Sequence, residues 1–411
     1  MGEPKLRFKA DDGSDFSGWE EKTLGELCAP LTYGMNAAAT KFDGENRYIR
    51  ITDIDDETHA LLPNDIVSPS GELDDKYLVK KGDILLARTG ASTGKSFLYH
   101  PKDGKLFYAG FLIKAHVLPS SDDYFIYSQT LTDRYWKWVK TASMRSGQPG
   151  INANEYASYS FAVPSLPEQR KIADFLSAVD AVIAAQQAEV DAWEQRKKGV
   201  MQKLFSQEVR FKADDGSEFP AWESATVGEL FTFVTEKNKD GHINNVITNS
   251  AERGLVPQRE YFDKDIAVDG NTKGYTVIRK GDFVYNPRKS TSAPFGPFNI
   301  YERNEVGIVS PLYTCLTPYD DEMAPYLAWY FKTNRWHPYI VTHGAQSGAR
   351  HDRVGMTVAL MEGIPVLLPS LPEQRKIADC LASMDEVIRK AKDELAKWQE
   401  LKKGLLQQMF V

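Results

Sequence analysis

Apolar residues recur at alternating three- and four-residue steps along two long stretches of the chain. The first set is Ile172, Leu176, Val179, Ile183, Val190, Trp193, Val200 and Leu204, and the second is Ile377, Leu381, Met384, Ile388, Leu395, Trp398, Leu405 and Met409. This spacing is typical of the seam of a coiled coil. Ser165 and Pro167 supply a capping residue and a first-turn proline. We therefore expect two helices of about forty residues, each roughly 60 Å long.

The two stretches belong to a larger duplication. Residues 164–180 recur at 369–385, and residues 7–14 recur as residues 210–217 with an identical sequence. The chain thus contains two copies of one unit of roughly 200 residues. Between the repeated segments, residues 28–160 and 231–365 share only scattered positions. This pattern is expected if the repeated frame sets the geometry and the divergent inserts set what is recognised.

The duplication predicts an α+β architecture. A helix striped along one side needs a partner, and the other copy of the helix is the obvious one. We expect two globular mixed α/β domains separated by two long helices that form an intramolecular antiparallel coiled coil with pseudo-two-fold symmetry. The predicted segments are a first domain at 1–163, a spacer helix at 164–207, a second domain at 208–368 and a second spacer helix at 369–411.

The inserts have the signals of mixed secondary structure. Gly82 and Gly281 precede short apolar runs at 84–88 and 283–285, which predict buried strands. Residues 124–139 and 323–336 are amphipathic and rich in aromatics, so each predicts a helix. Four tryptophans of these segments are expected to anchor the core: Trp136, Trp138, Trp329 and Trp336.

The net charge is −7, which by itself argues mildly against a nucleic-acid ligand. The charge is unevenly distributed, however. Residues 1–79 contain 8 basic and 17 acidic residues, whereas residues 80–150 contain 11 basic and 5 acidic residues. A basic face is what contact with duplex DNA requires, because phosphate neutralisation dominates affinity. An unevenly charged but merely solvated surface is the alternative.

Other compositional features exclude several classes of protein. The three cysteines lie far apart, which fits unpaired thiols in the cytoplasm. No apolar run is long enough to span a membrane. The seven histidines form no metal-binding pattern, so we expect no metal and no cofactor. No nucleophile-elbow pattern occurs, and we expect no catalytic residues.

Three short motifs resemble catalytic or nucleotide-binding signatures and fail on inspection. Residues 89–96 are similar to a phosphate-binding P-loop, but the two glycines are four residues apart rather than five, and the following residues look extended. Residues 20–22 lack the acidic partner of a nuclease motif. Residues 286–289 lack the second proline and the aromatic residue of an amino-methyltransferase motif.

Two polar and basic loops in each insert are the best candidates for DNA contact. Arg, Lys, Gln and Asn side chains can pair with phosphates and with the edges of guanine and adenine. The candidates in the first insert are Arg88, Thr89, Ser92, Thr93, Lys95, Arg145, Ser146, Gln148 and Asn152. Those in the second insert are Arg288, Lys289, Ser290, Thr291, Gln346, Ser347, Arg350 and Arg353. Ordinary exposed turns are the alternative for any single residue.

The chain resembles the specificity subunits of type I restriction-modification systems. The resemblance rests on LPSLPEQRKIAD at 368–379, on VPSLPEQRKIAD at 163–174, and on the Trp-to-Lys-Lys-Gly pattern near both helix ends. The residues that match the family's helix motif are Glu168, Arg170, Trp193, Glu373, Arg375 and Trp398. Each of these either packs internally or meets a partner subunit, and we favour internal packing.

The resemblance implies a DNA-binding protein without catalytic activity. Each insert would read one half of an asymmetric, bipartite site in double-stranded DNA, and the helices would set the distance between the halves. Two modification subunits would methylate adenine, and restriction subunits would join them in the full nuclease. Competing hypotheses are an autonomous DNA-binding regulator, a fused nuclease or methyltransferase, and a purely structural coiled-coil scaffold.

Overall fold

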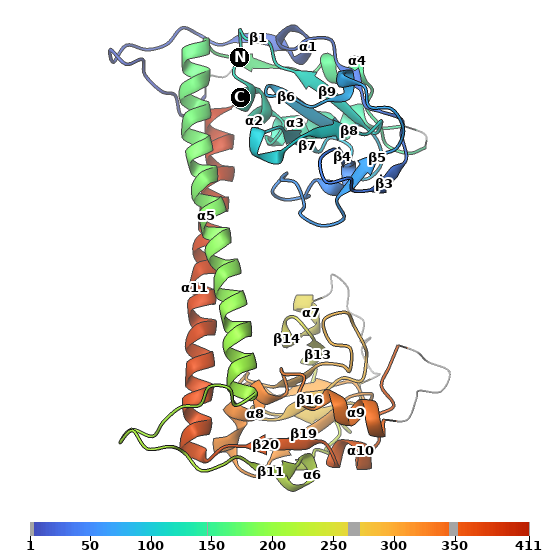
Figure 1. Ribbon diagram of the computed structural model, residues 1–411, viewed down its shortest axis with the longest axis vertical. Helices are drawn as coiled ribbons and strands as arrows, with labels where there is room; N and C mark the ends of the chain where they lie inside the picture. Colours follow the sequence, from blue (N-terminus) through green and yellow to red (C-terminus); the bar gives the residue numbers. More distant parts are fainter. Residues whose placement is uncertain (1–3, 146, 262–271, 345–351, 411) are drawn as a thin grey trace. The chain divides into compact units, whose positions relative to one another are not determined.

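The structure is a computed structural model that describes residues 4–145, 147–261, 272–344 and 352–410 (Figure 1). The chain divides into two compact units. One comprises Met1–Ala188 together with Lys392–Val411, and the other comprises Glu189–Ala391. The expected long helices are α5 (Leu166–Phe205) and α11 (Leu371–Met409). Each helix begins in one unit and ends in the other.

The first unit is built around an antiparallel sheet with the strand order β2-β9-β6-β7. These strands are β2 (Thr32–Tyr33), β9 (Leu112–His116), β6 (Asp83–Ala87) and β7 (Ser96–Leu98). Strands β1 (Glu20–Thr23) and β10 (Ser160–Val163) form a separate antiparallel pair, which leads directly into α5. The buried strand expected after Gly82 is therefore confirmed as β6.

Smaller elements complete this unit. The remaining strands are β3 (Ala39–Lys41), β4 (Arg47–Ile49), β5 (Val67–Pro69) and β8 (Leu106–Tyr108). The short helices are α1 (Leu24–Leu27), α2 (Asp123–Gln129), α3 (Asp133–Ala142) and α4 (Ala153–Ala157). Three 3-10 turns are η1 (Ile51–Asp53), η2 (Asp75–Tyr77) and η3 (Pro101–Asp103).

The second unit repeats this arrangement. The order β12-β19-β16-β17 corresponds to β2-β9-β6-β7, and the pair β11-β20 corresponds to β1-β10. The strands are β11 (Glu223–Thr226), β12 (Phe231–Phe233), β16 (Phe283–Tyr285), β17 (Phe298–Ile300), β19 (Thr314–Pro318) and β20 (Pro365–Leu368). The second expected strand, at 283–285, is confirmed as β16. The duplication seen in the sequence is thus a duplication of the fold.

A further sheet of the second unit has the order β14-β13-β18-β15. Its strands are β13 (Val246–Ser250), β14 (Gly254–Pro257), β15 (Thr276–Ile278) and β18 (Gly307–Val309). Among the described residues, the short helices are α6 (Val227–Leu230), α7 (Gln258–Tyr261), α8 (Ala324–Tyr330), α9 (His337–His343) and α10 (Val358–Glu362), and η4 (Asp321–Met323) is a 3-10 turn.

The single helices expected at 124–139 and 323–336 are wrong. The first segment is divided into α2 and α3 because Thr130 turns its hydroxyl back to the Tyr127 carbonyl (2.6 Å), and Thr132 then caps α3 through the Tyr135 amide (3.2 Å). In the second segment, α8 ends before Thr333, whose hydroxyl donates to the Tyr330 carbonyl (2.6 Å). Threonine hydroxyls compete with the helical hydrogen-bond pattern in this way.

Three of the four expected tryptophan anchors are confirmed. Trp329 and Trp336 are buried, and Trp138 packs against the core of the first unit. Trp136 was expected in the core but is 39% exposed. It follows buried Tyr135 by one position in α3, so it is turned about 100° around the helix axis from that residue and stays partly in solvent.

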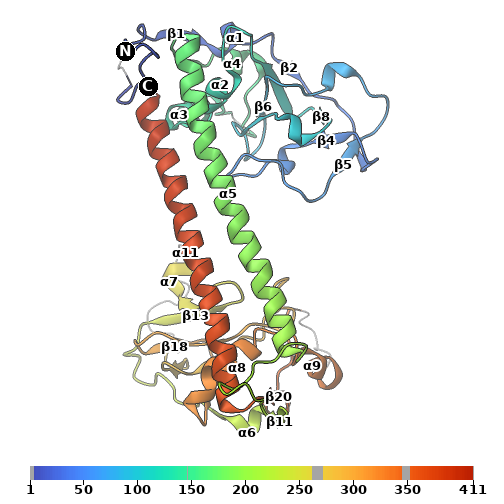
Figure 2. The same cartoon turned by 60° about the vertical axis from the view of Figure 1, so that its left-hand side comes forward.

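Inside each unit, the beginning of one long helix lies antiparallel beside the end of the other (Figure 1, Figure 2). In the first unit, Lys402 of α11 forms an ion pair with Asp180 of α5 (2.7 Å). In the second unit, Lys197 of α5 pairs with Asp385 of α11. The two pairs are equivalent under the 205-residue repeat of the sequence. The expected antiparallel pairing of the helices is therefore confirmed within each unit.

The last turn of each long helix packs in the core of the unit where it ends. Met409 and Phe410 join the core of the first unit, where the ring centres of Phe410 and Phe125 are 5.4 Å apart. Leu204 and Phe205 join the core of the second unit, where the ring centres of Phe205 and Tyr326 are 5.6 Å apart. Each core is therefore completed by the helix that comes from the other copy of the repeat.

A buried carboxylate near the start of each long helix holds the leading segment of the same repeat. Glu168 and Glu373 have fully buried side chains. The guanidinium of Arg7 donates two hydrogen bonds to Glu168 (3.0 and 2.9 Å), and Arg210 does the same to Glu373 (3.0 and 2.6 Å). Trp222 adds a third donor to Glu373 (3.1 Å). A buried charge needs such compensation to be tolerated.

Replacing Arg210 by alanine is expected to lower the free energy of unfolding by about 3 kcal/mol or more, because the Glu373 charge stays buried without its partner. Arg279→Ala is the matched control, since it breaks a two-bond pair with Glu236 whose side chains are about half exposed. That loss should stay below about 1 kcal/mol. Urea unfolding of the full chain, followed by tryptophan fluorescence, measures both. Equal losses would contradict the role given to the buried pair.

Candidate nucleic-acid interface

In both units, the predicted loops meet where the central strand of the sheet ends. Strand β6 ends at Ala87, and the Arg88 carbonyl then accepts a hydrogen bond from the Ile151 amide (2.9 Å). The Gly90 amide donates to the Pro149 carbonyl (3.0 Å). Two loops that are about sixty residues apart in sequence therefore lie side by side. This brings together candidates that the sequence could only name separately.

The second unit repeats these backbone bonds with different residues. The Val354 amide donates to the Pro287 carbonyl (2.8 Å), and the Lys289 amide donates to the Asp352 carbonyl (2.9 Å). By these bonds, Pro287 occupies the place of Arg88, and Arg288 occupies the place of Thr89. The same backbone scaffold thus presents different side chains in the two units.

Arg88 is held at its place in the first unit by both its backbone and its side chain. Its amide donates to the Phe111 carbonyl (3.0 Å), and its guanidinium donates to the Gly110 carbonyl (3.4 Å). The guanidinium carbon also lies 4.7 Å from the centre of the Tyr33 ring, a cation–π distance. Tyr33 is 42% exposed. Sequence reasoning missed Tyr33, because nothing in a two-residue edge strand distinguishes it from a core aromatic.

Several first-unit candidates have internal structural partners. The Thr93 hydroxyl donates to the Gly90 carbonyl (2.7 Å), and Asn152 caps α4 through the Glu155 amide (2.9 Å). Arg145 pairs with Glu155 and also donates to the Ala142 carbonyl (2.9 Å). Thr93 and Asn152 therefore shape the loops, and we leave them out of the proposed DNA contacts, whereas the Arg145 side chain stays 40% exposed. Thr89 and Ser92 are half-buried and Gln148 is exposed, and Ser146 lies outside the described residues.

Lys95 is buried, with 5% of its surface exposed. Its ammonium group donates to the Ile54 carbonyl (2.7 Å) and to the Asp56 carboxylate (2.6 Å). The segment that resembled a P-loop therefore uses its lysine to hold the loop at 54–56. We leave Lys95 out of the proposed DNA contacts for this reason.

The turn that carries these residues is fixed by glycine and tyrosine. Gly94 has φ +96°, and a Cβ there would lie 2.6 Å from a methyl group of Val139. The Tyr135 hydroxyl donates to the Gly94 carbonyl (2.8 Å), and the Tyr156 hydroxyl donates to the Ala87 carbonyl (2.6 Å). Burial raises the pKa of both tyrosines, so both hydroxyls stay protonated as donors.

The candidates of the second unit border an open hollow of about 470 Å³. Arg288, Lys289, Ser290 and Arg353 are among the residues that line it, and Thr291 is exposed beside them. A bridge between Arg288 and Arg353 joins the two loops across this region. The remaining candidates, Gln346, Ser347 and Arg350, lie outside the described residues. The hollow therefore brings three basic side chains to one surface, together with one carboxylate, that of Glu252.

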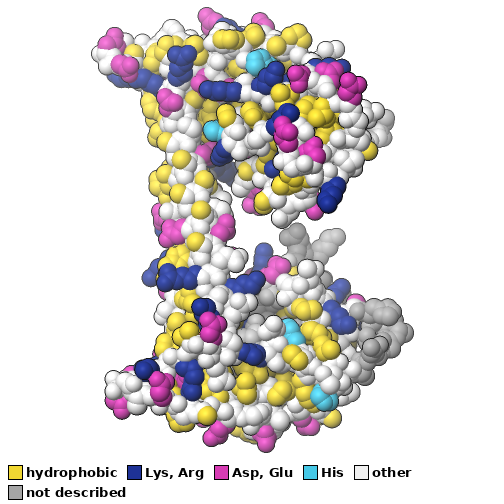
Figure 3. Space-filling view, in the orientation of Figure 1, with side chains coloured by type: hydrophobic (Ala, Val, Ile, Leu, Met, Phe, Trp, Pro, Cys, Tyr) yellow, Lys and Arg dark blue, Asp and Glu magenta, His cyan; other side chains and the backbone are white. Residues whose placement is uncertain are grey.

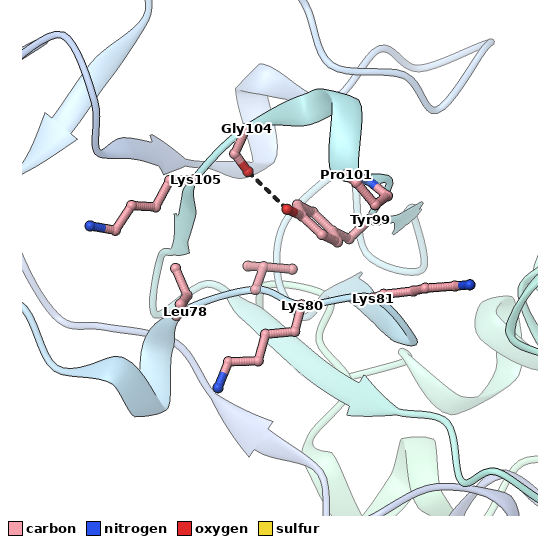
Figure 4. A pocket seen from close by; sticks show the side chains of 8 residues that line it. Leu78, Lys80, Lys81, Tyr99, Pro101, Gly104 and Lys105 are labelled. Carbon is pink, nitrogen blue, oxygen red and sulfur yellow. Dashed lines mark hydrogen bonds between the residues drawn. The ribbon is translucent and has the colours of Figure 1, made fainter.

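A second hollow, of about 410 Å³, lies at the beginning of β6 rather than at its end. Figure 4 shows its lysines, Lys80, Lys81 and Lys105, pointing away from one another. Lys105 also pairs with Glu45 (3.1 Å). On the face drawn in Figure 3, basic and acidic side chains of the first unit are interspersed. The lysines around this hollow therefore do not converge on one anion.

The helix-motif residues have mainly internal contacts in the described structure. Glu168 and Glu373 hold the leading segments, and exposed Arg375 donates to Glu322 (2.7 Å). Trp193 and Trp398 are both half-buried, and the guanidinium carbon of Arg196 lies 5.1 Å from the centre of the Trp193 ring. Arg170 is exposed. Whether these residues also meet a partner subunit stays a prediction.

Other kinds of site find little support in the described part of the chain. No cluster of three or more His, Cys, Asp or Glu side chains there has a metal-binding arrangement. No helix among these residues is long and apolar enough to cross a bilayer. Burial raises the pKa of the Cys28 and Cys315 thiols to about 12, which makes them poor nucleophiles.

The chain is similar in sequence to known DNA specificity proteins. Residues 17–192 match the family model described as the type I restriction modification DNA specificity domain. A putative type I restriction enzyme MjaX specificity subunit from Methanocaldococcus jannaschii is 24% identical over 420 residues, which cover 95% of this chain and 92% of the relative. The MjaVIII specificity subunit of the same organism is 28% identical over 167 residues, or 39% of this chain and 38% of the relative.

Solved structures agree on the fold. The type I restriction-modification S subunit from M. genitalium has a TM-score of 0.56 at 16% identity, covering 100% of this chain and 99% of that one. A chain from a structure of the complex assembly and conformational transition of the type I R-M system has a TM-score of 0.55 at 17% identity, covering 95% and 97%. Over its whole length, this chain has the fold of type I specificity subunits and a sequence similar to theirs.

Replacing Lys95 by methionine is expected to lower the free energy of unfolding by about 1–3 kcal/mol, because the Ile54 carbonyl loses a charged donor. Lys289→Met, at an exposed position of the equivalent loop, should leave stability unchanged within about 0.5 kcal/mol. Urea unfolding of the two variants tests this. Unchanged stability of Lys95→Met together with weakened DNA binding would show that the Lys95 ammonium serves DNA instead.

Proposed function

We propose that this protein is the sequence-specific DNA recognition subunit of a type I restriction-modification complex. It reads an asymmetric, bipartite site and directs adenine methylation or cleavage that partner subunits perform. One observation carries the proposal: a single duplicated scaffold presents two different sets of polar and basic side chains at equivalent strand ends. The match of residues 17–192 to a DNA specificity domain supports the same conclusion.

The two different loop pairs account for an asymmetric target. Each unit would read one half of the site, with the globular parts at 1–163 and 208–368 as the recognition domains and the helices at 164–207 and 369–411 as the spacer between them. The proposed DNA contacts in the first unit are Arg88, Thr89, Ser92, Arg145, Ser146 and Gln148. Those in the second unit are Arg288, Lys289, Ser290, Thr291, Gln346, Ser347, Arg350 and Arg353.

The proposed partners supply the chemistry. Two modification subunits would bind the spacer helices and the recognition domains and would hold the methyl donor, and restriction subunits would complete the nuclease. This chain itself would need no cofactor and would carry no catalytic residue. The pseudo-two-fold repeat supports two partner copies, because each unit contains one beginning and one end of the long helices.

Reconstitution tests the proposal. The purified chain alone is expected to transfer no methyl group to DNA, whereas addition of the modification subunit of the same system should give adenine methylation at one bipartite sequence. Sequencing of methylated adenines in DNA treated with the complex reads out the site. Methyl transfer by the chain alone would contradict the proposal. Equally tight sequence-specific binding with and without partners would favour an autonomous DNA-binding protein.

Two neighbouring residues of the second unit are expected to have different effects on binding. Lys289→Ala should weaken binding to all sequences alike and lower the slope of log affinity against log salt by about 1, because one phosphate contact is lost. Arg288→Ala should relax the preference at one base pair by about 1–3 kcal/mol. Salt titrations of the assembled complex on matched and mismatched duplexes separate the effects. Thr291→Ala, which removes no charge, is the control for the salt slope.

A further inference from the structure

An exposed apolar side chain lies at the same structural position in both units. Phe111 is 64% exposed and Leu312 is 56% exposed. In the first unit, Ala87 of β6 pairs with Leu112 of β9. In the second unit, the register of β16 and β19, continued by one residue, places Asn286 opposite Tyr313, which is the equivalent pair. The residue before each of these partners is Phe111 in the first unit and Leu312 in the second. Both therefore occupy the same turn of the duplicated scaffold.

This turn belongs to the surface formed by the predicted loops. The Phe111 carbonyl accepts the Arg88 amide (3.0 Å), and the neighbouring Gly110 carbonyl accepts the Arg88 guanidinium (3.4 Å). Leu312 lines the hollow that also contains Arg288, Lys289 and Arg353. In each unit, an exposed apolar group thus lies among side chains suited to phosphates and base edges.

Duplex DNA offers one apolar group to such a side chain. In the major groove, the 5-methyl group of thymine is the apolar feature that distinguishes one base pair from the others. A phenyl or isobutyl group can neither donate nor accept a hydrogen bond. In the major groove, it can therefore distinguish base pairs only by contact with this methyl group. The difference between phenylalanine and leucine also fits two inserts that have diverged.

We propose that Phe111 and Leu312 are specificity-determining residues, each of which contacts a thymine methyl group in the half-site bound by its own unit. This inference rests on the proposed function of the chain. A partner protein could also cover an exposed apolar residue. Arg88 lies next to this turn in the first unit, however, and Arg288, Lys289 and Arg353 line the same hollow as Leu312 in the second, and these basic side chains favour the polyanionic duplex.

Replacing single thymines by uracil tests the proposal, because uracil lacks only the methyl group. The assembled complex of specificity and modification subunits is titrated at fixed salt with duplexes that carry uracil at each thymine of the mapped site in turn. In the wild-type complex, we expect one such position in each half to weaken binding about three- to fivefold. A wild-type complex indifferent to uracil at every position would overturn the proposal.

The variants assign each contact to its residue. Phe111→Ala should abolish the uracil penalty in one half only, and Leu312→Ala should abolish it in the other half only, so each variant is the control for the other. Phe111→Leu should retain the penalty, because it keeps an apolar group at the turn. Tyr319→Ala is a matched control: Tyr319 is 67% exposed but follows β19, whereas Leu312 precedes it.

Two further results would count against the proposal. One is a uracil penalty that persists in Phe111→Ala and Leu312→Ala. The other is a loss of binding to the modification subunit in these variants, which would assign the apolar residues to a protein interface. Failure of the proposed function is distinguishable from both, because the wild-type complex would then show no sequence preference on unmodified DNA.

Discussion

The exchange of helix ends between the two copies of the repeat is the interaction on which the rest of the structure depends. Phe410 packs against Phe125 in the first unit, and Phe205 packs against Tyr326 in the second. Neither core is complete without the helix that begins in the other copy. Burying a large aromatic side chain contributes about 1.5–3 kcal/mol. The two units are therefore coupled in stability, since loss of one long helix removes part of both cores.

The buried carboxylates near the helix starts explain why the repeated segments resist change. Glu168 and Glu373 tie α5 and α11 to leading segments that lie about 160 residues earlier in the sequence. A buried charge tolerates little variation in its partner, and each arginine is held in a fixed two-bond geometry. The strand ends carry no such constraint on their side chains. The backbone bonds at the strand ends are the same in both units, but the side chain at the equivalent position differs. It is Arg88 in the first unit and Pro287 in the second.

The polar loops show how one scaffold can serve two specificities. In the first unit, the loop backbone is held by hydrogen bonds from the Tyr135 and Tyr156 hydroxyls to the Gly94 and Ala87 carbonyls. Gly94 also has no room for a side chain. These contacts leave the exposed side chains of the loops free to vary. Gly296 has an equivalent constraint in the second unit, because a Cβ there would lie 2.0 Å from the Asn286 carbonyl oxygen. Side chains on such a rigid turn can be exchanged without altering the fold. We infer that this separation allows the two proposed recognition surfaces to differ.

The sequence by itself determined the duplication, the two long helices, the strands at β6 and β16 and the loops that carry the basic residues, because all of these follow from local periodicity and internal repetition. Only the tertiary structure decided which loop residues are available. Lys95, Thr93 and Asn152 have polar side chains like those of their neighbours, yet they bond inward. Lys95 bonds to the Ile54 carbonyl, Thr93 to the carbonyl of its own turn at Gly90, and Asn152 to the start of α4. Phe111 and Leu312 look like core residues in the sequence, but the turn before β9 and β19 exposes them. Burial depends on contacts between distant segments, and local sequence patterns do not contain that information.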